Sequence, residues 1–550
     1  MNNVFILFKK NVEYLILVFF ICAYLCFAIK DITLPGINFD EGTVASEAIN
    51  LLKNKNTHYV FITDSIFLGR RLPLMMSYYD PILGSYLLLP FFSLFGISVF
   101  SLRGSVIFFA LLALILTYIL TKKMFNRKAA FIAILLLVTS PDFILSTRIL
   151  NFFFSYTFFF SMTALFCFMR WRESNQARYF FLGAFLLGMG LSASLWFIAP
   201  LIAIPVAALI AFGRKELTGK TKRIFIHFLG LIFFLLGNFS LFYANFINKS
   251  TFFMTGEYIF KHFRDTGSNM SNLDYLTNIT QRFKHLLYLL EQRGLVNEVF
   301  IPGEGNVFFK YVFFFSLFWL IISLFFRKNL YFKKTKILFI ILVAGIIFMF
   351  SPFTLSSFHI SYLTMLTPYL QIIIALGLIE FSWCFKEKIL RKISIALVCF
   401  TILALAGANM KAMKGYYADM RRAGGRSLWS DAIYELADWI KKVKPSNVVA
   451  LTFGFSRNLY FLLGGEVYIQ DIHSSSGFNF EEREQNFKDI VTTHFLKDER
   501  TRYLVNVQWC DQRAYELFKK IVNSAGKRLV EDKLFYQRDG EPVFMVYSVK

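Results

Sequence analysis

Long apolar runs separated by short basic clusters constrain the fold of this chain more than any other feature. Hydrophobic residues make up 56% of the 550 positions, and 70 residues are phenylalanine. No water-soluble domain could bury this much apolar surface. Most Lys and Arg residues lie in the clusters between the runs, so the net charge of +23 indicates membrane topology and not nucleic-acid binding. The sequence therefore predicts a polytopic α-helical membrane protein.

The basic clusters predict the orientation of these helices, because Lys and Arg accumulate on the cytoplasmic side. An even number of crossings between successive clusters gives about eleven transmembrane helices, provided that 81–95 lies along the outer interface. The first run is followed by Lys30-Asp31 and lacks a small-residue cleavage site, so we interpret it as a retained helix. The predicted spans are 12–29, 101–121, 129–145, 151–169, 179–193, 195–212, 224–245, 307–326, 337–353, 359–381 and 393–410.

Under this topology all large polar segments lie on the outer face. They are the loops 30–100 and 246–306, which belong to a membrane module over 1–410, and the tail 411–550. The tail alternates strand-like runs with amphipathic helical ones, which predicts an extracytoplasmic α/β domain. The strand-like runs are 448–453, 503–508 and 543–549, and the helical runs are 428–443 and 511–525.

The cytoplasmic loops are too short to form a nucleotide pocket, and the chain contains neither a P-loop nor a dinucleotide-binding glycine turn. An activated substrate should then reach the outer face through the bilayer, as a polyprenyl-phosphate carrier does. Such a site needs a carboxylate for the acceptor and cations for the phosphate. No nucleic-acid partner is expected, whereas membrane lipids are.

The acidic pair Asp40 and Glu41 follows the first predicted span by about ten residues. Carboxylates held just outside a membrane suit proton transfer on a lipid-borne substrate. Asp40 is the predicted general base, and Glu41 is expected to orient a basic partner or a loop more than to share the proton. The alternative is that Asp40 only caps a helix over 42–52, because Asp favours that position.

Several outer-side cations could bind the donor phosphate, since the guanidinium fork suits a phosphodiester. Each has a plainer alternative. It is lipid headgroup binding for Arg70 and Arg71, an ion pair with Asp142 for Arg148, and an interfacial role for His359. No ligand cluster demands a metal, but a divalent cation, Mg²⁺ or Mn²⁺, could sit beside the acidic pair. The candidate phosphate-binding residues are Arg70, Arg71, Arg148, Arg264 and His359, with Tyr362 as an added hydroxyl donor.

At these positions the chain resembles the GT-C glycosyltransferases that use polyprenyl-phosphate sugars, the broad group of protein O-mannosyltransferases and lipid A aminoarabinose transferases. The resemblance covers most of 1–410 by order and topology. Three departures affect the donor site: Asn151 stands where an acidic residue is common, Ser361 where a basic one is, and 192–194 lacks a frequent lysine. The motifs are 39–42 with 45–48, 79–84 with 94–96 and 101–103, 139–141 with 146–148, and 359–362 with Pro368.

The resemblance implies a GT-C-like fold and an inverting glycosyltransferase in the bacterial inner membrane. It would move a sugar from a polyprenyl phosphate to a hydroxyl or amine of a glycan, lipid or protein on the periplasmic or extracellular side. An O-antigen-type polymerase or ligase is a second hypothesis, resting on His262, Arg264, Arg282 and His285. A flippase or transporter is a third, disfavoured because the helices carry few charges away from their ends. In the tail, Trp509 suits sugar stacking as well as core packing, whereas packing is favoured for Trp439.

Overall fold

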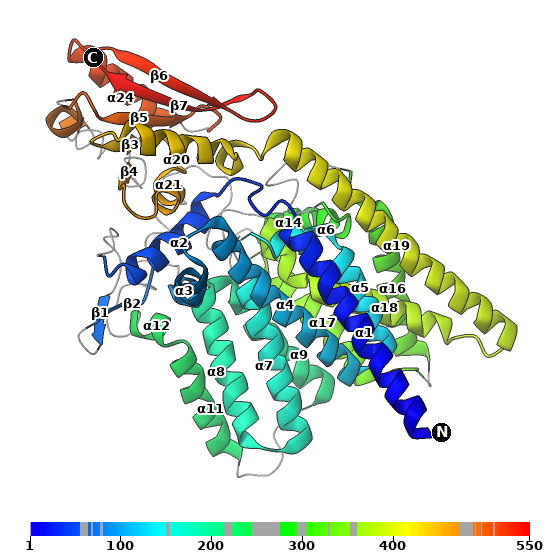
Figure 1. Ribbon diagram of the computed structural model, residues 1–550. Coiled ribbons are helices and arrows are strands. Elements are labelled where there is room, and N and C mark those ends of the chain that lie inside the picture. Colours follow the sequence, from blue (N-terminus) through cyan, green and yellow to red (C-terminus); the bar gives the residue numbers. More distant parts are fainter. Residues whose placement is uncertain are drawn as a thin grey trace.

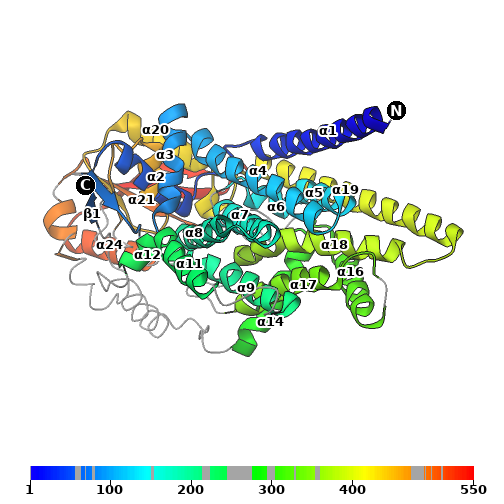
Figure 2. The same cartoon turned by 90° about the horizontal axis from the view of Figure 1, so that it is seen from below.

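The structure is a computed structural model of the 550-residue chain, and it is dominated by one helical bundle with a sheet-containing domain at one end (Figure 1). In Figure 2 the elements between the first and the second predicted span lie together with those of the tail. The residues that the structure describes are 2–55, 64–67, 70–76, 81–149, 154–213, 223–244, 275–293, 304–327, 330–352, 360–471, 488–489, 491–496, 498–509 and 512–550.

Each of the eleven predicted spans overlaps at least one helix, and this confirms the polytopic helical fold. Six of the described helices are long and apolar enough to cross a membrane by length and composition alone. The protein is therefore a multi-pass membrane protein. The eleven helices are α1 (Asn2–Ile29), α4 (Val99–Met124), α5 (Arg127–Thr139), α7 (Phe154–Ser174), α8 (Ala177–Ala193), α9 (Ile198–Phe212) after the 3₁₀ turn η1 (Leu195–Phe197), α11 (Arg223–Gly237), α16 (Val307–Phe326), α17 (Lys334–Phe350), α18 (Thr367–Ser382) after the 3₁₀ segment η3 (Ile360–Leu366), and α19 (Lys388–Ala423).

Three predicted spans differ from the observed helices, and one of them, 224–245, divides at Asn238 into Arg223–Gly237 and Phe239–Phe242. The span 129–145 is interrupted, because Ser140 leaves the helical conformation and caps a separate helix, α6 (Pro141–Ser146), through a hydrogen bond from the Phe143 amide. Pro141 is well placed at that start since it has no N–H to satisfy. The span 393–410 is too short at both ends: α19 has 36 residues and ends only at Gly424, which adopts φ of 75°. Position 410 thus lies inside a helix that connects the bundle directly to the tail (Figure 1).

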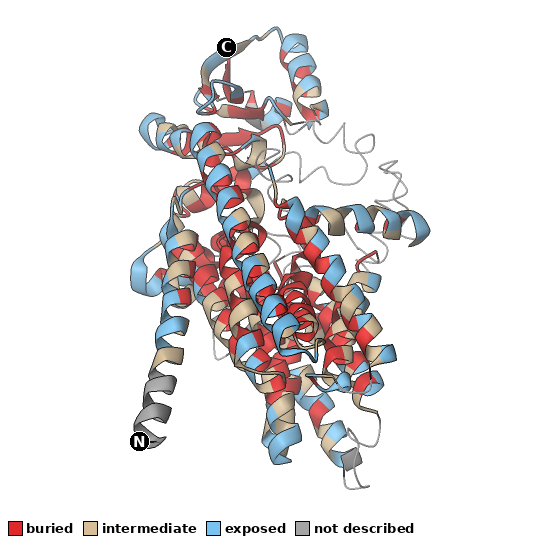
Figure 3. Ribbon diagram, turned by 90° about the vertical axis from the view of Figure 1, so that its right-hand side faces the viewer, coloured by how far each residue is buried: buried red, intermediate tan, exposed pale blue. Residues whose placement is uncertain are grey.

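Burial follows the expected pattern of a bundle in lipid. The helix α18 is buried along almost its whole length, whereas α1, α11 and α19 expose many large apolar side chains. Figure 3 shows buried residues concentrated inside the bundle and exposed ones on its outer helices. Apolar side chains on the outside are stable when lipid surrounds them.

Short elements cover the end of the bundle beneath the tail domain. The segment 81–95, which is predicted to lie along the outer membrane interface, contains α3. This helix lies beside α2 at the same end of the bundle (Figure 1). The amphipathic α14 packs against η3 at the same end. These elements are α2 (Phe39–Leu52), the antiparallel hairpin β1 (Asp64–Phe67) and β2 (Arg70–Pro73), α3 (Leu83–Phe95), α12 (Phe239–Phe242) and α14 (Tyr275–Leu290).

The tail forms the predicted α/β domain. Its five-stranded sheet has the order β4-β3-β5-β7-β6, with β3 parallel to both neighbours and the other pairs antiparallel. Side chains of the three central strands alternate between the two faces of the sheet, so α20 and α21 pack on one face and α24 on the other. The elements are η4 (Ser427–Trp429), α20 (Ala432–Val443), β3 (Val448–Ala450), α21 (Ser456–Leu462), β4 (Ile469–Asp471), the π-helical turn η5 (Val491–Phe495), β5 (Arg502–Asn506), α24 (Arg513–Ser524), β6 (Leu529–Tyr536) and β7 (Pro542–Val549).

Candidate active site

Asp40 lies in the first turn of α2, a helix held between the end of the bundle and the tail domain (Figure 1). The N-cap of α2 is Asn38, whose Oδ1 accepts a hydrogen bond from the Glu41 amide at 2.9 Å. The Glu41 carboxylate in turn accepts one from the Asn38 amide at 3.4 Å, which completes a capping box. The alternative that Asp40 itself caps a helix over 42–52 is therefore wrong. Asp40 follows this N-cap by two residues and is half-buried.

Glu41 forms a buried ion pair with Arg103 of α4. The Arg103 Nε donates to one carboxylate oxygen at 2.9 Å and Nη2 to the other at 2.8 Å, and both side chains are fully buried. The same guanidinium donates to the carbonyls of Ile32, Pro35 and Gly36. A paired and hydrogen-bonded charge can be accommodated at this depth. The pair fixes both the start of α2 and the preceding loop on the bundle, as expected for an orienting role of Glu41.

Arg148 holds the same loop from a second side. It follows α6, is fully buried, and donates to the Leu34 carbonyl at 3.1 Å and to the carbonyl of Asp31. Its Nη1 donates to the Tyr417 hydroxyl of α19 at 2.9 Å. These hydrogen bonds, and not an ion pair with Asp142, occupy Nη1 and Nη2 of the guanidinium, whereas Nε is buried without a hydrogen-bond partner among the described residues. Arg148 and Arg103 thus both donate hydrogen bonds to carbonyls of the loop 31–36, which leads to Asp40.

A third contact to this loop comes from the tail domain. The Tyr434 hydroxyl of α20 donates to the Thr33 carbonyl at 2.8 Å. Burial raises the pKa of the Tyr434 phenol, so the hydroxyl stays protonated and remains a donor. The loop before Asp40 is therefore fixed by the bundle and by the tail at once.

The tail domain also packs directly on α2 through α21. The Ser46 hydroxyl donates to the Arg457 carbonyl at 3.1 Å, and the Tyr460 hydroxyl donates to the Asn50 side chain at 2.6 Å. Gly42 permits this approach, because a Cβ there would lie 2.4 Å from the Asn458 amide nitrogen. A glycine is needed wherever two backbones come this close.

Tyr362 belongs to a different part of this end of the bundle. It is buried in η3 and stacks on Trp196 with ring centroids 3.6 Å apart. The guanidinium of Arg282 lies 5.5 Å from the Tyr362 ring centroid. A cation over an aromatic face is an attractive arrangement. Tyr362 is thus tied to a buried cation as well as to a tryptophan.

The sequence predicts a role for Arg282 only under the polymerase or ligase hypothesis, and not in binding the donor phosphate. Its Nε donates to the Ser351 carbonyl at 3.0 Å, and Nη1 lies 3.3 Å from Nδ1 of His285. The signal that could have selected it is its place on the amphipathic α14, where the apolar face contains a buried arginine. A buried charge is costly unless it is paired or hydrogen-bonded, and such charges are frequent at functional sites.

The other predicted phosphate-binding residues are only partly placed. Arg70 and Arg71 are in β2, opposite Phe67 and Ile66 of β1, but their side chains lie outside the described part of the chain. Arg264 and His359 also lie outside the described residues.

A metal ion beside the acidic pair would have few ligands among the described residues. In that part of the chain no group of three or more His, Cys, Asp or Glu side chains gathers. Both oxygens of Glu41 are bound by Arg103, so only Asp40 of the pair could contribute. The described residues therefore do not form a complete divalent-cation site.

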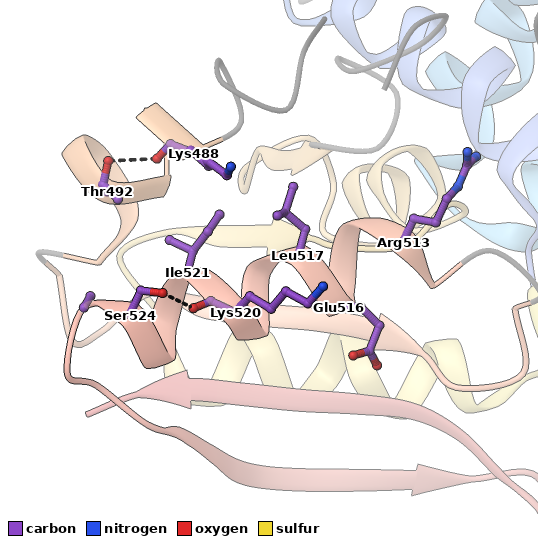
Figure 4. A pocket seen from close by; sticks show the side chains of 9 residues that line it. Lys488, Thr492, Arg513, Glu516, Leu517, Lys520, Ile521 and Ser524 are labelled. Atoms are coloured by element: carbon purple, nitrogen blue, oxygen red, sulfur yellow. Dashed lines mark hydrogen bonds between the residues drawn. The ribbon is translucent and has the colours of Figure 1, made fainter. Parts of the chain in front are cut away.

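A separate pocket of about 670 Å³ lies on α24 in the tail domain (Figure 4). Its wall combines the basic side chains of Lys488, Arg513 and Lys520 with the carboxylate of Glu516. None of the site residues predicted from the sequence lines this pocket.

Comparison with known proteins connects this arrangement to a group of membrane enzymes. The sequence profile of the family described as dolichyl-phosphate-mannose-protein mannosyltransferase matches residues 79–238. The solved structure of ArnT from Cupriavidus metallidurans in the apo state superposes with a TM-score of 0.60 at 12% identity, covering 98% of both chains. The same protein bound to undecaprenyl phosphate gives 0.58 at 13% identity, covering 96% of this chain and 97% of that one.

The chain has the GT-C glycosyltransferase fold. The oligosaccharyltransferase of Archaeoglobus fulgidus shares it more distantly, with a TM-score of 0.54 at 13% identity over 93% of this chain and 71% of that one. No curated protein matches the sequence. The predicted fold is confirmed by the solved structures, and the predicted glycosyltransferase class is confirmed by the mannosyltransferase profile together with that fold. The profile begins at Tyr79 and spans the α4 helix that carries Arg103.

Proposed function

We propose that this GT-C chain is an inverting glycosyltransferase that moves a sugar from a polyprenyl phosphate to an acceptor hydroxyl or amine. The main support is the position of Asp40, half-buried on a helix whose start is held by Arg103 and whose preceding loop is held by Arg148. The shared fold with an ArnT structure bound to undecaprenyl phosphate adds support for the carrier. A related archaeal structure contains dolichol phosphate and an inhibitory peptide.

The reaction follows from the chemistry of a single carboxylate. The oxygen of an acceptor hydroxyl attacks C1 of the donor sugar from the face opposite the phosphate. The C1–O bond to the phosphate breaks, the polyprenyl phosphate leaves with the electron pair, and the configuration at C1 inverts. Asp40 takes the acceptor proton as the new C–O bond forms, since an ordinary Asp side chain is ionised at neutral pH. The transfer comes late in the reaction because a hydroxyl is far less acidic than Asp.

The leaving phosphate needs cations that stabilise its developing charge. Arg70, Arg71, Arg264 and His359 remain proposed for this role, with Tyr362 as a hydroxyl donor. The contacts of Arg282 with Tyr362 support adding it to this set. Arg148 is the least suited of the predicted residues, because its Nη1 and Nη2 donors are directed at Tyr417 and the loop carbonyls.

The proposed location is the bacterial inner membrane, with Asp40 and the tail domain on the periplasmic or extracellular side. Basic clusters at the opposite ends of the helices support this orientation. The acceptor is a glycan, a lipid or a protein. A solved structure of the archaeal relative is tethered to an acceptor peptide, and another contains Zn and sulfate. A divalent cation beside Asp40 is retained as part of the proposal, tested by chelation and re-addition of Mg²⁺ or Mn²⁺.

The decisive experiment is an assay of the purified protein in nanodiscs with a panel of undecaprenyl-phosphate sugars and candidate acceptors. We expect release of undecaprenyl phosphate together with an acceptor whose mass increases by one sugar residue. A flippase would instead move the lipid across the bilayer without changing the mass of its headgroup. Lipid movement with no change in any product mass would contradict the proposal.

A further inference from the structure

The carboxyl ends of β3 and β5 form a position in the tail domain where ligands commonly bind. These strands are parallel neighbours, with Val448 opposite Arg502 and Ala450 opposite Leu504. The helix after β3, α21, packs on one face of the sheet, whereas the helix after β5, α24, packs on the other. In open α/β sheets such a divergence opens a crevice beyond the carboxyl ends of the two strands.

Aromatic side chains lie at this position and lead towards Asp40. Phe453 follows β3 by three residues, and Trp509 follows β5 by three residues. Their ring centroids are 5.4 Å apart. The ring of Phe39, the residue before Asp40, lies 4.6 Å from that of Phe453. The three side chains, here called the aromatic shelf, are all only half-buried, and together they connect the tail domain to the first turn of α2.

The shelf also contains a fixed hydrogen-bond donor. Nε1 of Trp509 is buried and has no hydrogen-bond partner among the described residues. The turn that carries it is held by Gln512, whose Nε2 donates to the carbonyls of Asn506 at 2.9 Å and Trp509 at 2.7 Å. A buried indole N–H usually has an acceptor, and leaving it unpaired costs free energy. A bound ligand with an oxygen at this point would supply that acceptor.

We propose that Phe39, Phe453 and Trp509 bind a sugar ring of the acceptor and present its nucleophilic group to Asp40. A pyranose has an apolar C–H face that packs on aromatic rings and a rim of hydroxyl oxygens that accept hydrogen bonds. It matches both the ring faces and the free indole donor. An isoprenoid chain would match the rings alone and leave Nε1 unpaired. This inference rests on the proposed function and specifies the acceptor as a saccharide or a glycan-bearing lipid or protein.

Sugar binding can be measured separately from transfer. Full-length protein in nanodiscs is titrated with methyl β-D-glucoside, methyl α-D-mannoside and chitobiose, followed by saturation-transfer difference NMR. We expect the wild-type protein to saturate the ring C–H protons of at least one of these probes. Trp509→Ala should weaken binding by about tenfold, the scale expected for one aromatic anchor. Trp509→Phe, which keeps an aromatic face but loses the donor, should give an intermediate loss.

Trp439→Ala is the matched control, because Trp439 packs on Phe535 in the same domain and is not part of the shelf. It should bind the probes as the wild type does. Equal binding of the sugar probes by wild type, Trp509→Ala and Trp509→Phe would overturn the proposal. A second titration uses undecaprenyl phosphate, and variants that bind only this lipid more weakly would also overturn it. Trp509→Phe keeps the test valid if the alanine variant does not fold. The proposed transferase activity is judged separately by donor consumption, so either can fail alone.

Discussion

Arg103 and Glu41 form a fully buried ion pair in which the Nε and Nη2 atoms each donate to one carboxylate oxygen, at 2.9 and 2.8 Å. The pair joins α4 to the start of α2, and Arg103 also binds three carbonyls of the loop before it. One member of the acidic pair thus holds the position from which the other can act. This arrangement leads to a clear difference between the two carboxylates under mutation.

Glu41→Gln should lower the free energy of unfolding by about 3–5 kcal/mol, because it leaves Arg103 buried without its counter-charge. Equilibrium unfolding in mixed micelles measures this change. The control is Glu435→Gln, which removes an exposed pair with Lys533 and should cost less than about 1 kcal/mol. If Glu41→Gln were as stable as the wild type but inactive, Glu41 would have a chemical role and not a positioning one.

Arg148→Lys should lower kcat while leaving the KM for the donor within about twofold, since a lysine cannot reproduce the fork of donors that holds the loop. Tyr417→Phe, which removes the hydroxyl next to Arg148, should act in the same direction but more weakly. Steady-state kinetics with varied donor concentration separate the two parameters. A large rise in the donor KM with unchanged kcat would instead support phosphate binding by Arg148.

Gly42→Ala should destabilise the contact between α2 and α21 by about 1–3 kcal/mol, the usual range for overpacking. The added Cβ would lie 2.4 Å from the Asn458 amide nitrogen. Gly415→Ala is matched to it, because this helical glycine has open space around a new Cβ and alanine favours helix. The thermal midpoint of each variant gives the comparison, and a Gly42→Ala variant as stable as Gly415→Ala would contradict the close packing.

The end of α14 should show a pH-dependent stability. Burial raises the pKa of the Glu291 carboxyl, but hydrogen bonds from Lys310 and Arg293 offset it, and the pKa is lowered overall from its usual 4.5. The folded state thus favours the charged form, so its contribution is present above pH 4.5 and is lost as the pH falls through the lowered pKa. Thermal midpoints between pH 3 and 6 should fall more steeply for wild type than for Glu291→Gln. Identical slopes would contradict this account.

The sequence was sufficient for the eleven helices and for the α/β tail, because apolar length and amphipathic period are local signals. It was not sufficient for the break at Ser140, where a capping serine and Pro141 interrupt a continuous apolar run. It also missed α21, β4 and β6 in the tail. The strand β6 has a weak local signal, since its burial pattern does not alternate regularly and its pairing with β7 contains register shifts.

Site partners were harder to predict than site residues. Asp142 is close to Arg148 in sequence, yet the described partners of Arg148 are Tyr417, 269 positions away, and the loop carbonyls. The pairing of Gly42 with Asn458 likewise joins the first loop to the tail. Such contacts are set by how the helices pack and not by local pattern, so no single-sequence signal could have identified them.

The most direct test of the account is donor turnover by Asp40→Asn in nanodiscs, with undecaprenyl-phosphate sugar and the acceptor that the wild type uses. Asp419→Asn, which alters an exposed pair with Arg422, is the control, and unfolding midpoints confirm that both variants fold. Loss of a general base should reduce kcat by about 10²–10⁴-fold in Asp40→Asn, with the control near wild type. Wild-type turnover by folded Asp40→Asn would contradict the central claim that Asp40 is the base.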